Sequence, residues 1–348
     1  MTLAPRPWIL DVPPYVPGVP GGDEDGSLAS NESPLGASPE VGVSIAKAVD
    51  NIHRYPDPLA TELRAALAAH HGVRPEQILV GNGSDELIML LAIGYLAQGG
   101  QVVCAEPAYR IDEISTQLVG GTVHGVPLVD GVHDLETMAA VEADVAYVVN
   151  PHNPTGTTRS RADVERFLRT RRARFAIVDE AYIDFCDDPA EASAIGLLPL
   201  GGFAVLRTFS KVYGLAGLRI GYLVAPAEVA DVLRRVRTPF SVNALAQAGA
   251  LAALRDRDHL ELVRRHALAA REELTAELRA IGLAPYASQA NFVLVPVPDE
   301  AAAAEHFARH EVRVRPGTAL GMPGHVRISV PSARGMVRLR SAIRTLPR

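Results

Sequence analysis

The chain has 348 residues, of which 48% are hydrophobic and 21% are charged, so it can bury a sizeable core and is not a wholly disordered protein. Its formal charge of −6 argues against a nucleic-acid-binding protein, because such proteins carry a basic patch. The longest apolar run, 87–97, is shorter than the ~20 residues of a membrane-spanning helix. Residues 1–20 lack the apolar region of a signal peptide, and two cysteines make no disulfide framework. These features predict a soluble, cytoplasmic globular protein.

Short apolar runs alternate with helical patterns between about residues 77 and 226, after an amino-terminal stretch rich in proline and glycine. Most of the runs contain Val or Ile and end at Gly, Pro, Asn or Asp, as buried strands do. The alternation predicts an α/β fold, with a mostly parallel seven-stranded sheet and helices on both of its faces. The expected strands are 78–80, 101–105, 122–126, 145–149, 175–178, 204–206 and 220–224.

The character of the sequence changes after Pro226. Residues 230–281 are almost continuously helical in pattern, with a break at Pro239 and Asn243. Strand-like pieces at 291–295, 312–315 and 325–330 follow, together with helical stretches near 300–309 and 337–343. We therefore expect an N-terminal arm over 1–30, a large α/β domain over 31–240, connecting helices over 241–280 and a small α+β C-terminal domain over 281–348.

Lysine is scarce in this chain, because only Lys47 and Lys211 account for it among 34 basic residues. Lys47 fits the solvent face of a short helix, whereas Lys211 lies among glycines, hydroxyls and two arginines in 207–221. Lysine, unlike arginine, can lose its proton and form a Schiff base. The composition therefore raises a covalent role for Lys211, with chance occurrence as the alternative.

Polar motifs follow several of the expected strands. Two glycines in 80–88 join a strand to a helix, which predicts a phosphate cradle at the helix start or, alternatively, an ordinary cap by Ser84 or Asp85. The proline-rich turn 150–156 points Asn153 outward, and its neighbour His152 is more simply a solvated loop histidine.

The strand at 175–178 is followed directly by Asp179 and, three residues later, by Tyr182. No set of ligands at metal spacing accompanies Asp179, so we expect no metal and favour a carboxylate that holds a protonated ring nitrogen. Hydroxyl and guanidinium groups around Lys211 are those that bind a phosphate. Phosphate-binding groups, a lysine and a carboxylate suited to a protonated ring nitrogen are all expected at one edge of the sheet. Together they predict pyridoxal phosphate.

The same motifs resemble those of the fold-type I pyridoxal-phosphate-dependent aminotransferases and, within them, the histidinol-phosphate aminotransferase family with its aromatic-amino-acid branch. The resemblance covers nearly the whole chain. The motifs that carry it are 28–34, 54–57, 81–86, 150–156, 179–182, 210–221 and 326–330.

The resemblance implies how the ring of pyridoxal 5'-phosphate is held. Lys211 would bond to the cofactor through its amine and later move a proton between the donor's Cα and the cofactor. Asp179 would pair with the protonated ring nitrogen. Tyr182 and Asn153 would hydrogen-bond the phenolic oxygen of the ring, and Tyr109 would stack on it.

The resemblance also implies how the phosphate and the substrate are bound. Arg327 would grip the substrate α-carboxylate beside Asn31, with a surface ion pair as the alternative for this arginine. Tyr15 and Arg315 would lie around the distal group of the substrate or, with equal weight, have no role. The cofactor phosphate would be bound by Gly83, Ser84, Asp85, Thr208, Ser210 and Arg219, and by Tyr55 from a second subunit, which requires a homodimer with shared active sites.

Two positions depart from the family pattern. Asp112 stands where members often carry a second aromatic residue, and 331–335 reads Pro-Ser-Ala-Arg-Gly where members usually carry Gly-x-x-Glu-Glu. Both lie where recognition of the substrate side chain or closure of the small domain could change.

The sequence thus predicts a ping-pong aminotransferase of amino-acid biosynthesis. It would transfer the amino group of histidinol phosphate or an aromatic amino acid to a 2-oxo acid such as 2-oxoglutarate. A decarboxylase or secondary-metabolite enzyme on the same scaffold, for example one like the threonine-phosphate decarboxylases, is the alternative. A non-catalytic pyridoxal-phosphate-binding module is the alternative from another class.

Overall fold

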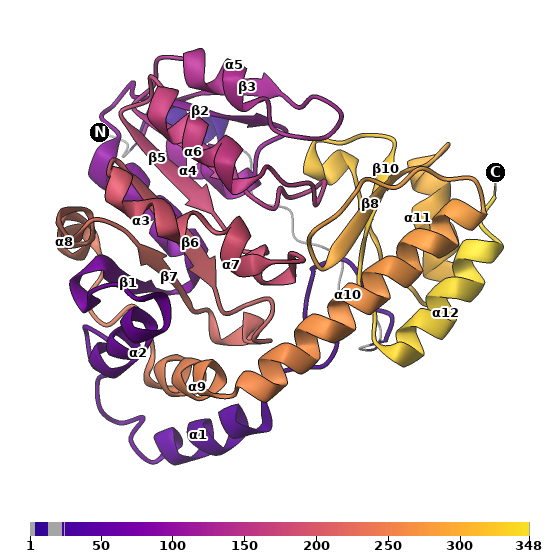
Figure 1. Cartoon of the computed structure of the whole chain (residues 1–348), viewed down its shortest axis with the longest axis horizontal. Coiled ribbons are helices and arrows are strands. Elements are labelled where there is room, and N and C mark those ends of the chain that lie inside the picture. Colours follow the sequence, from indigo (N-terminus) through magenta and orange to yellow (C-terminus); the bar gives the residue numbers. More distant parts are fainter. Residues whose placement is uncertain (1–3, 13–22, 24, 348) are drawn as a thin grey trace.

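The computed structural model describes residues 4–12, 23 and 25–347. Its larger sheet has seven strands in the order β1-β7-β6-β5-β4-β2-β3, and β7 runs in the opposite direction to the other strands (Figure 1). The predicted α/β fold with a mostly parallel seven-stranded sheet is therefore confirmed. The strands are β1 Ile78–Gly81, β2 Gln101–Glu106, β3 Thr122–Pro127, β4 Val145–Val149, β5 Phe175–Asp179, β6 Phe203–Thr208 and β7 Gly221–Val224.

Helices cover both faces of this sheet. On one face, α3 (Gly83–Tyr95) and α8 (Ala227–Val236) pack against the sheet in one apolar cluster. The other face carries the core formed with α2 (Thr61–His71), α5 (Leu135–Ala140), α6 (Arg161–Thr170) and α9 (Ala244–Arg255). Because the central strands are buried on both sides, their sequences are continuous apolar runs rather than alternating patterns.

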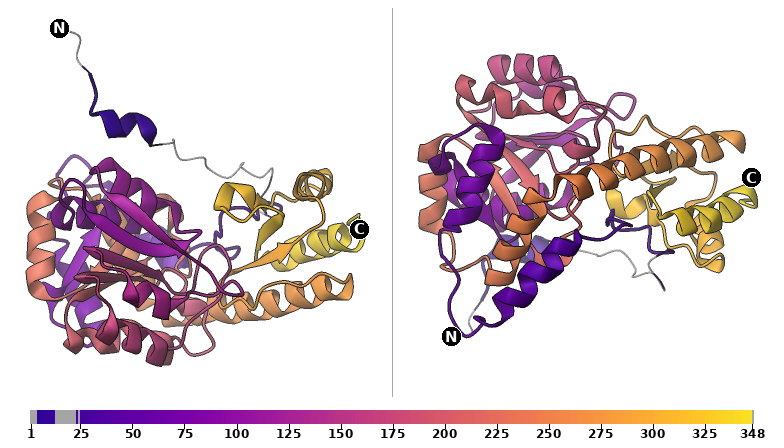
Figure 2. Two further views of the ribbon diagram at one scale, coloured as in Figure 1. Left: turned by 90° about the horizontal axis from the view of Figure 1, so that it is seen from above. Right: turned by 60° about the horizontal axis from the view of Figure 1, so that its bottom comes forward.

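A second, three-stranded antiparallel sheet has the order β8-β10-β9. Its strands are β8 Phe292–Pro296, β9 Arg315–Pro316 and β10 His325–Ser329, and its core includes the buried Phe292, Phe307 and Leu339. The helices α11 (Glu300–Arg309) and α12 (Ala333–Arg344) accompany it. The long helix α10 (Arg257–Ala280) runs from α9 to β8 and so connects the two sheets (Figure 2).

The strand expected at 312–315 is wrong in its extent, because β9 begins only at Arg315. The preceding residues pair elsewhere. The N–H of Arg313 donates to the carbonyl oxygen of Gly26 at 2.7 Å, and its own carbonyl oxygen accepts from the N–H of Leu28 at 2.9 Å. Residues 26–28 therefore take the backbone hydrogen bonds of Arg313 that a longer β9 would have used.

The helical region after Pro226 contains the expected break and one more. At the expected break, Asn243 caps α9, because its Oδ1 accepts from the N–H of Ala246 at 2.8 Å. The further break lies at Asp256, whose Oδ1 accepts from the N–H of His259 at 3.0 Å and starts α10. The remaining helices are α1 Pro39–Val49, α4 Arg110–Leu118 and α7 Pro189–Ala192.

Within the described part of the chain, no helix combines the length and the apolar character needed to cross a bilayer.

Candidate active site

One cavity of about 850 Å³ gathers most of the predicted site residues. It lies where the carboxyl ends of β4, β5 and β6 meet the start of α3, and the small sheet supplies another side. Open α/β sheets bind their ligands at this edge. The predicted residues that line the cavity are Asn31, Ser84, Asp85, Tyr109, Asn153, Asp179, Tyr182, Thr208, Ser210, Lys211, Arg219, Arg315 and Arg327.

Lys211 lies in the turn after β6, between the buried side chains of Phe209 and Val212. Its Nζ donates a hydrogen bond of 3.1 Å to the carbonyl oxygen of Ser30. The same atom lies 5.7 Å from the centre of the Tyr182 ring. The amine is therefore placed to react with a ligand that enters the cavity.

Asp179 is the last residue of β5 and is 3% exposed. Its Oδ1 accepts a hydrogen bond of 2.9 Å from the backbone N–H of Ala181. Burial raises the pKa of Asp179 to about 7; the hydrogen bond from Ala181 opposes this rise, and the charges of Asp85 and Glu180 add to it. A cation beside such a carboxyl would favour its ionised form. The position therefore suits a ligand with a positively charged nitrogen.

The turn between β1 and α3 leads into a helix start whose geometry suits an anion. The helix begins at Gly83, and its N-cap Asn82 makes no side-chain capping bond, so the alternative of a cap by Ser84 or Asp85 is wrong. Both residues lie in the first turn, where the N–H groups have no partner within the helix and attract anions. Gly83 has φ 80°, and a Cβ there would lie 2.7 Å from Nη2 of Arg219, so the turn requires glycine.

The side chain of Asp85 joins two other cavity residues. Its Oδ2 accepts from Nη2 of Arg219 at 3.1 Å, and its Oδ1 accepts from the hydroxyl of Tyr109 at 3.0 Å. This carboxylate would repel a phosphate, so Asp85 can bind one only through its backbone N–H. The hydroxyls of Thr208 and Ser210 belong to buried residues at the end of β6 and just beyond it.

Arg327 connects the small sheet to the large one. It is 5% exposed on β10, and its Nη1 donates to Oδ1 of Asn153 at 2.7 Å while its Nη2 donates to the carbonyl oxygen of Ala29 at 2.8 Å. Its guanidinium carbon lies 5.2 Å from the centre of the Phe292 ring. Arg315 lies opposite it in the pairing of β9 with β10. The alternative of a surface ion pair is therefore wrong for Arg327.

Asn31 is held by the predicted residue Tyr182 and by two residues to which the sequence analysis assigns no role, Ser329 and Asn291. Its Nδ2 donates to the Tyr182 hydroxyl at 3.0 Å, and its Oδ1 accepts from the hydroxyl of Ser329 at 2.9 Å. Its carbonyl oxygen accepts from Nδ2 of Asn291 at 3.0 Å. Ser329 follows Arg327 by two positions on one strand, and this spacing places both on the same face of the small sheet.

Two predicted residues within the described part of the chain are not part of the lining. Gly83 lies just beneath Arg219, as described above. Tyr55 is 82% exposed and stacks on Phe240, with 4.6 Å between ring centres, so it does not enter this chain's own cavity. Tyr15 lies outside the described residues.

Two residues that the sequence places near the site are buried beside it. Asp112 is 1% exposed, does not line the cavity, and has no hydrogen-bond partner for either carboxylate oxygen among the described residues. Burial raises its pKa well above the usual value, and the charge of Asp179 adds to this. His152 is fully buried rather than solvated, with Nε2 at 3.1 Å from the carbonyl oxygen of Pro107.

The departure at 331–335 forms the start of α12. Ser332 is its N-cap, and its hydroxyl accepts from the N–H of Gly335 at 2.9 Å. None of these five described residues lines the cavity. The cavity is lined in addition by residues to which the sequence analysis assigns no role, among them Glu32, Glu106, Arg110, Glu113 and 318–321.

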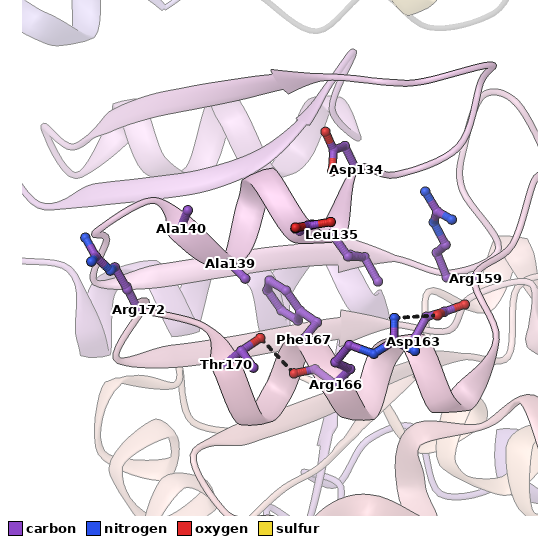
Figure 3. A pocket seen from close by; sticks show the side chains of 11 residues that line it. Asp134, Leu135, Ala139, Ala140, Arg159, Asp163, Arg166, Phe167, Thr170 and Arg172 are labelled. Atoms are coloured by element: carbon purple, nitrogen blue, oxygen red, sulfur yellow. Dashed lines mark hydrogen bonds and ion pairs between the residues drawn. The ribbon is translucent and has the colours of Figure 1, made fainter.

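A second cavity, of about 580 Å³, lies between α5 and α6 (Figure 3). Its lining contains Phe167 and several charged side chains. Two of the arginines already have partners: Arg166 donates to Asp163 at 3.2 Å and Arg159 donates to the carbonyl oxygen of His133 at 2.6 Å. In the described part of the chain, no group of three His, Cys, Asp or Glu side chains could hold a metal ion.

The groups around the first cavity fit the parts of pyridoxal 5'-phosphate. The buried carboxyl of Asp179, with its raised pKa, suits a protonated ring nitrogen. The first turn of α3 and the Arg219 guanidinium suit a phosphate, and Gly83 leaves the space for that approach. The Lys211 amine lies in the same cavity.

Comparison with known proteins shows to which family this chain belongs. The family model for aminotransferase class I and II matches residues 26–346. The chain belongs to this family. The protein is therefore an aminotransferase, as the sequence predicts, and the use of pyridoxal phosphate follows from membership.

Individual proteins to which this chain is similar are named histidinol-phosphate aminotransferase. The chain is 40% identical to histidinol-phosphate aminotransferase 2 of Methylococcus capsulatus, over 96% of this chain and 95% of that protein. It is 37% identical to the histidinol-phosphate aminotransferase of Brevibacillus brevis, over 94% of each. The crystal structure of the Sinorhizobium meliloti histidinol-phosphate aminotransferase with pyridoxal-5'-phosphate has a TM-score of 0.85 and 31% identity, over 92% of this chain and 91% of that one.

Proposed function

We propose that this aminotransferase binds pyridoxal 5'-phosphate at Lys211 and transfers the amino group of histidinol phosphate or an aromatic amino acid to a 2-oxo acid such as 2-oxoglutarate. The observation that carries the proposal is the meeting of the Lys211 amine, the buried Asp179 carboxyl and the Arg327 guanidinium in one cavity. The relatives named histidinol-phosphate aminotransferase support the choice of donor. The chemistry and these relatives favour a ping-pong enzyme of amino-acid biosynthesis in the cytoplasm.

The residues that hold the cofactor would act from separate elements. When bound, pyridoxal phosphate supplies a ring that withdraws electrons from the donor's Cα. Asp179 would hold the proton on the ring nitrogen, Asn153 and Tyr182 would hydrogen-bond the ring oxygen, and Tyr109 would contact the ring. The start of α3 and Arg219 would bind the phosphate, with Ser84, Thr208 and Ser210 as hydroxyl donors.

The substrate is then oriented by the small sheet. Arg327 would bind the α-carboxylate of an aromatic amino acid, or the phosphate of histidinol phosphate, which has no carboxylate, through two parallel hydrogen bonds, a geometry that a guanidinium provides and an ammonium does not. Asn31 and Arg315 lie beside it in the cavity. Lys211 would take the proton from the donor's Cα with its amine and then give it to the cofactor. A single base would therefore serve both proton transfers.

A second copy of this chain would complete the site. The described chain exposes large apolar side chains on α1 and in the segment that follows it, and Phe240 stacks on one of them, Tyr55: Val43, Val49, Ile52, Tyr55, Leu59 and Phe240. Exposed apolar patches of this kind mark protein interfaces. We propose that a homodimer covers this surface and that Tyr55 reaches the phosphate site of the neighbouring subunit.

The division of the chain at residues 30, 240 and 280 stays a prediction, and the helix α10, which spans 257–280, would be the hinge region between the two larger parts.

Reduction of the holoenzyme with borohydride, followed by peptide mass mapping, tests the site directly. The proposal predicts that the cofactor becomes fixed to Lys211, and Lys47 serves as the internal control because the sequence contains no third lysine. A label on Lys47, or on neither lysine, would contradict the proposal.

A further inference from the structure

The loop between β9 and β10 forms one wall of the cavity. Four consecutive residues, Thr318 to Gly321, line it, and η6 (Thr318–Leu320) is part of this segment. Gly321 has φ 75°, and a Cβ there would lie 2.6 Å from the Cβ of Pro107. The loop therefore lies directly against the segment that leads to Tyr109. We refer to residues 318–321 as the β9–β10 wall.

Glu300 holds this wall without lining the cavity itself. Its Oε1 accepts from the N–H of Thr318 at 2.9 Å. Its Oε2 accepts from the Thr318 hydroxyl at 3.0 Å and from the N–H of Gly324 at 2.8 Å. Two of the three donors are backbone groups. One belongs to the first residue of the wall, and the other lies three residues beyond its end, so the carboxylate fixes the path of the chain between them. Hydrogen bonds to an ionised acceptor are about twice as strong as those between neutral groups.

Glu300 is itself well anchored. It is the first residue of α11, which begins at the N-cap Asp299, where the side chain accepts from the N–H of Ala302 at 2.9 Å. The fully buried Phe307 fixes the same helix in the small core. The wall is thus tied to the core of the small sheet through one carboxylate.

The position of the wall relates it to the amino donor. It begins three residues after Arg315, which lies opposite Arg327 in the pairing of β9 with β10. The groups assigned to the cofactor follow β2, β4, β5 and β6, precede β7 or start α3, and none of them comes from the small sheet. The wall belongs to the small sheet, as Arg327 does, so we assign it to the side chain of a donor held at Arg327.

We infer that Glu300 is a positioning residue that determines which donor side chains the enzyme accepts, because it holds the β9–β10 wall against Pro107. This inference rests on the proposed function, since it assigns the wall to the amino donor.

The test uses the holoenzyme and its single-turnover reaction with histidinol phosphate, phenylalanine and alanine over a range of concentrations. Glu300→Ala should raise the half-saturating concentration of the two larger donors at least about tenfold. The maximal rate should change less than about twofold, and the visible spectrum of the holoenzyme should stay the same. The efficiency with alanine should also change less than about twofold, because the methyl group of alanine does not reach the wall. Glu300→Gln keeps one acceptor oxygen and should show a smaller rise.

Two further variants separate positioning from folding. Gly321→Ala pushes the wall away from Pro107 without touching Glu300 and should produce the same selective rise. Glu305→Ala changes an exposed glutamate of the same helix and should match the wild type. Unchanged half-saturation with the larger donors in both Glu300→Ala and Gly321→Ala would overturn the inference, as would a loss that affects alanine equally. Failure of the wild type to convert any donor would instead contradict the proposed function.

Discussion

Asn153 accepts a hydrogen bond of 2.7 Å from Nη1 of Arg327, although 174 positions separate the two residues along the chain. One lies just beyond β4 of the large sheet and the other on β10 of the small sheet. The contact therefore places a group assigned to the cofactor beside the group assigned to the substrate carboxylate. Formation of the site depends on the packing of the two sheets against each other.

The proposed bidentate binding of the donor by Arg327 leads to a kinetic prediction. Arg327→Lys keeps the positive charge but replaces two parallel donors by a point charge. We expect KM for the amino donor to rise on the order of 10- to 100-fold, with a smaller effect on kcat. Steady-state kinetics check this, with Arg344→Lys as the control because Arg344 pairs with Glu277 on the surface. An unchanged KM for every donor would remove Arg327 from the substrate site.

Asp179 leads to a prediction about pH and stability in the cofactor-free enzyme. Its pKa is about 7 in the folded protein, against an ordinary value of 3.8. An acid with a raised folded-state pKa contributes stability that is complete below pH 3.8 and is lost as the pH rises through about 7. Relative to Asp179→Asn, the wild type should therefore lose on the order of 4 kcal/mol of unfolding free energy between pH 4 and 8.

Urea unfolding of the two cofactor-free proteins at several pH values measures that difference. Parallel stability curves across the whole pH range would show that the carboxyl is not held in a desolvated position. Binding of the cofactor should reverse the trend, because a cationic ring nitrogen lowers the pKa of Asp179.

The fold was largely predictable because its signals are local. The strands of the large sheet are buried on both faces and therefore appear as short runs of Val and Ile, such as 145–149 and 175–178. The motifs that follow these strands lie at the same sheet edge, since parallel strands end together. Lys211 and Asp179 could be recognised for the same reason.

The features that could not be predicted from the sequence depend on contacts between distant parts of the chain. Arg313 pairs with the segment at 26–28 and not with β10, so β9 is shorter than expected, and no local pattern marks that choice. The link of Glu300 to Thr318 and Gly324 joins a helix start to a loop and carries no motif. The orientation of Asp112 also could not be read from the sequence, because a helical position alone does not show whether a carboxyl faces a cavity or a core.

Asp112 leads to a stability prediction. A buried carboxyl without a hydrogen-bond partner destabilises the fold by roughly 1–3 kcal/mol relative to an apolar group of similar size. Asp112→Leu should therefore raise the unfolding free energy, and the gain should grow with pH, because the raised pKa of Asp112 makes its ionisation costly. Chemical denaturation at pH 6 and pH 9 checks this. A less stable Asp112→Leu protein would show that the carboxyl has a stabilising partner.

Tyr55 leads to a prediction about subunit cooperation. Loss of one hydrogen bond to a charged phosphate in Tyr55→Phe should weaken cofactor binding on the order of tenfold. Mixed dimers of Tyr55→Ala and Lys211→Ala should regain activity, because one of their two sites contains both native side chains. The measurement is activity after mixing and refolding of the two inactive proteins. If no mixture exceeds the activity of its parents, the sites are not shared.

Transamination at Lys211 can be followed by a visible-spectrum titration of the holoenzyme with single amino donors and no acceptor. The panel contains histidinol phosphate, phenylalanine, tyrosine, arginine and threonine phosphate. We predict that histidinol phosphate or an aromatic donor abolishes the visible band of the lysine-bound cofactor and releases one equivalent of oxo product per site. A spectrum that never changes with any donor, or that changes only with release of carbon dioxide, would contradict it.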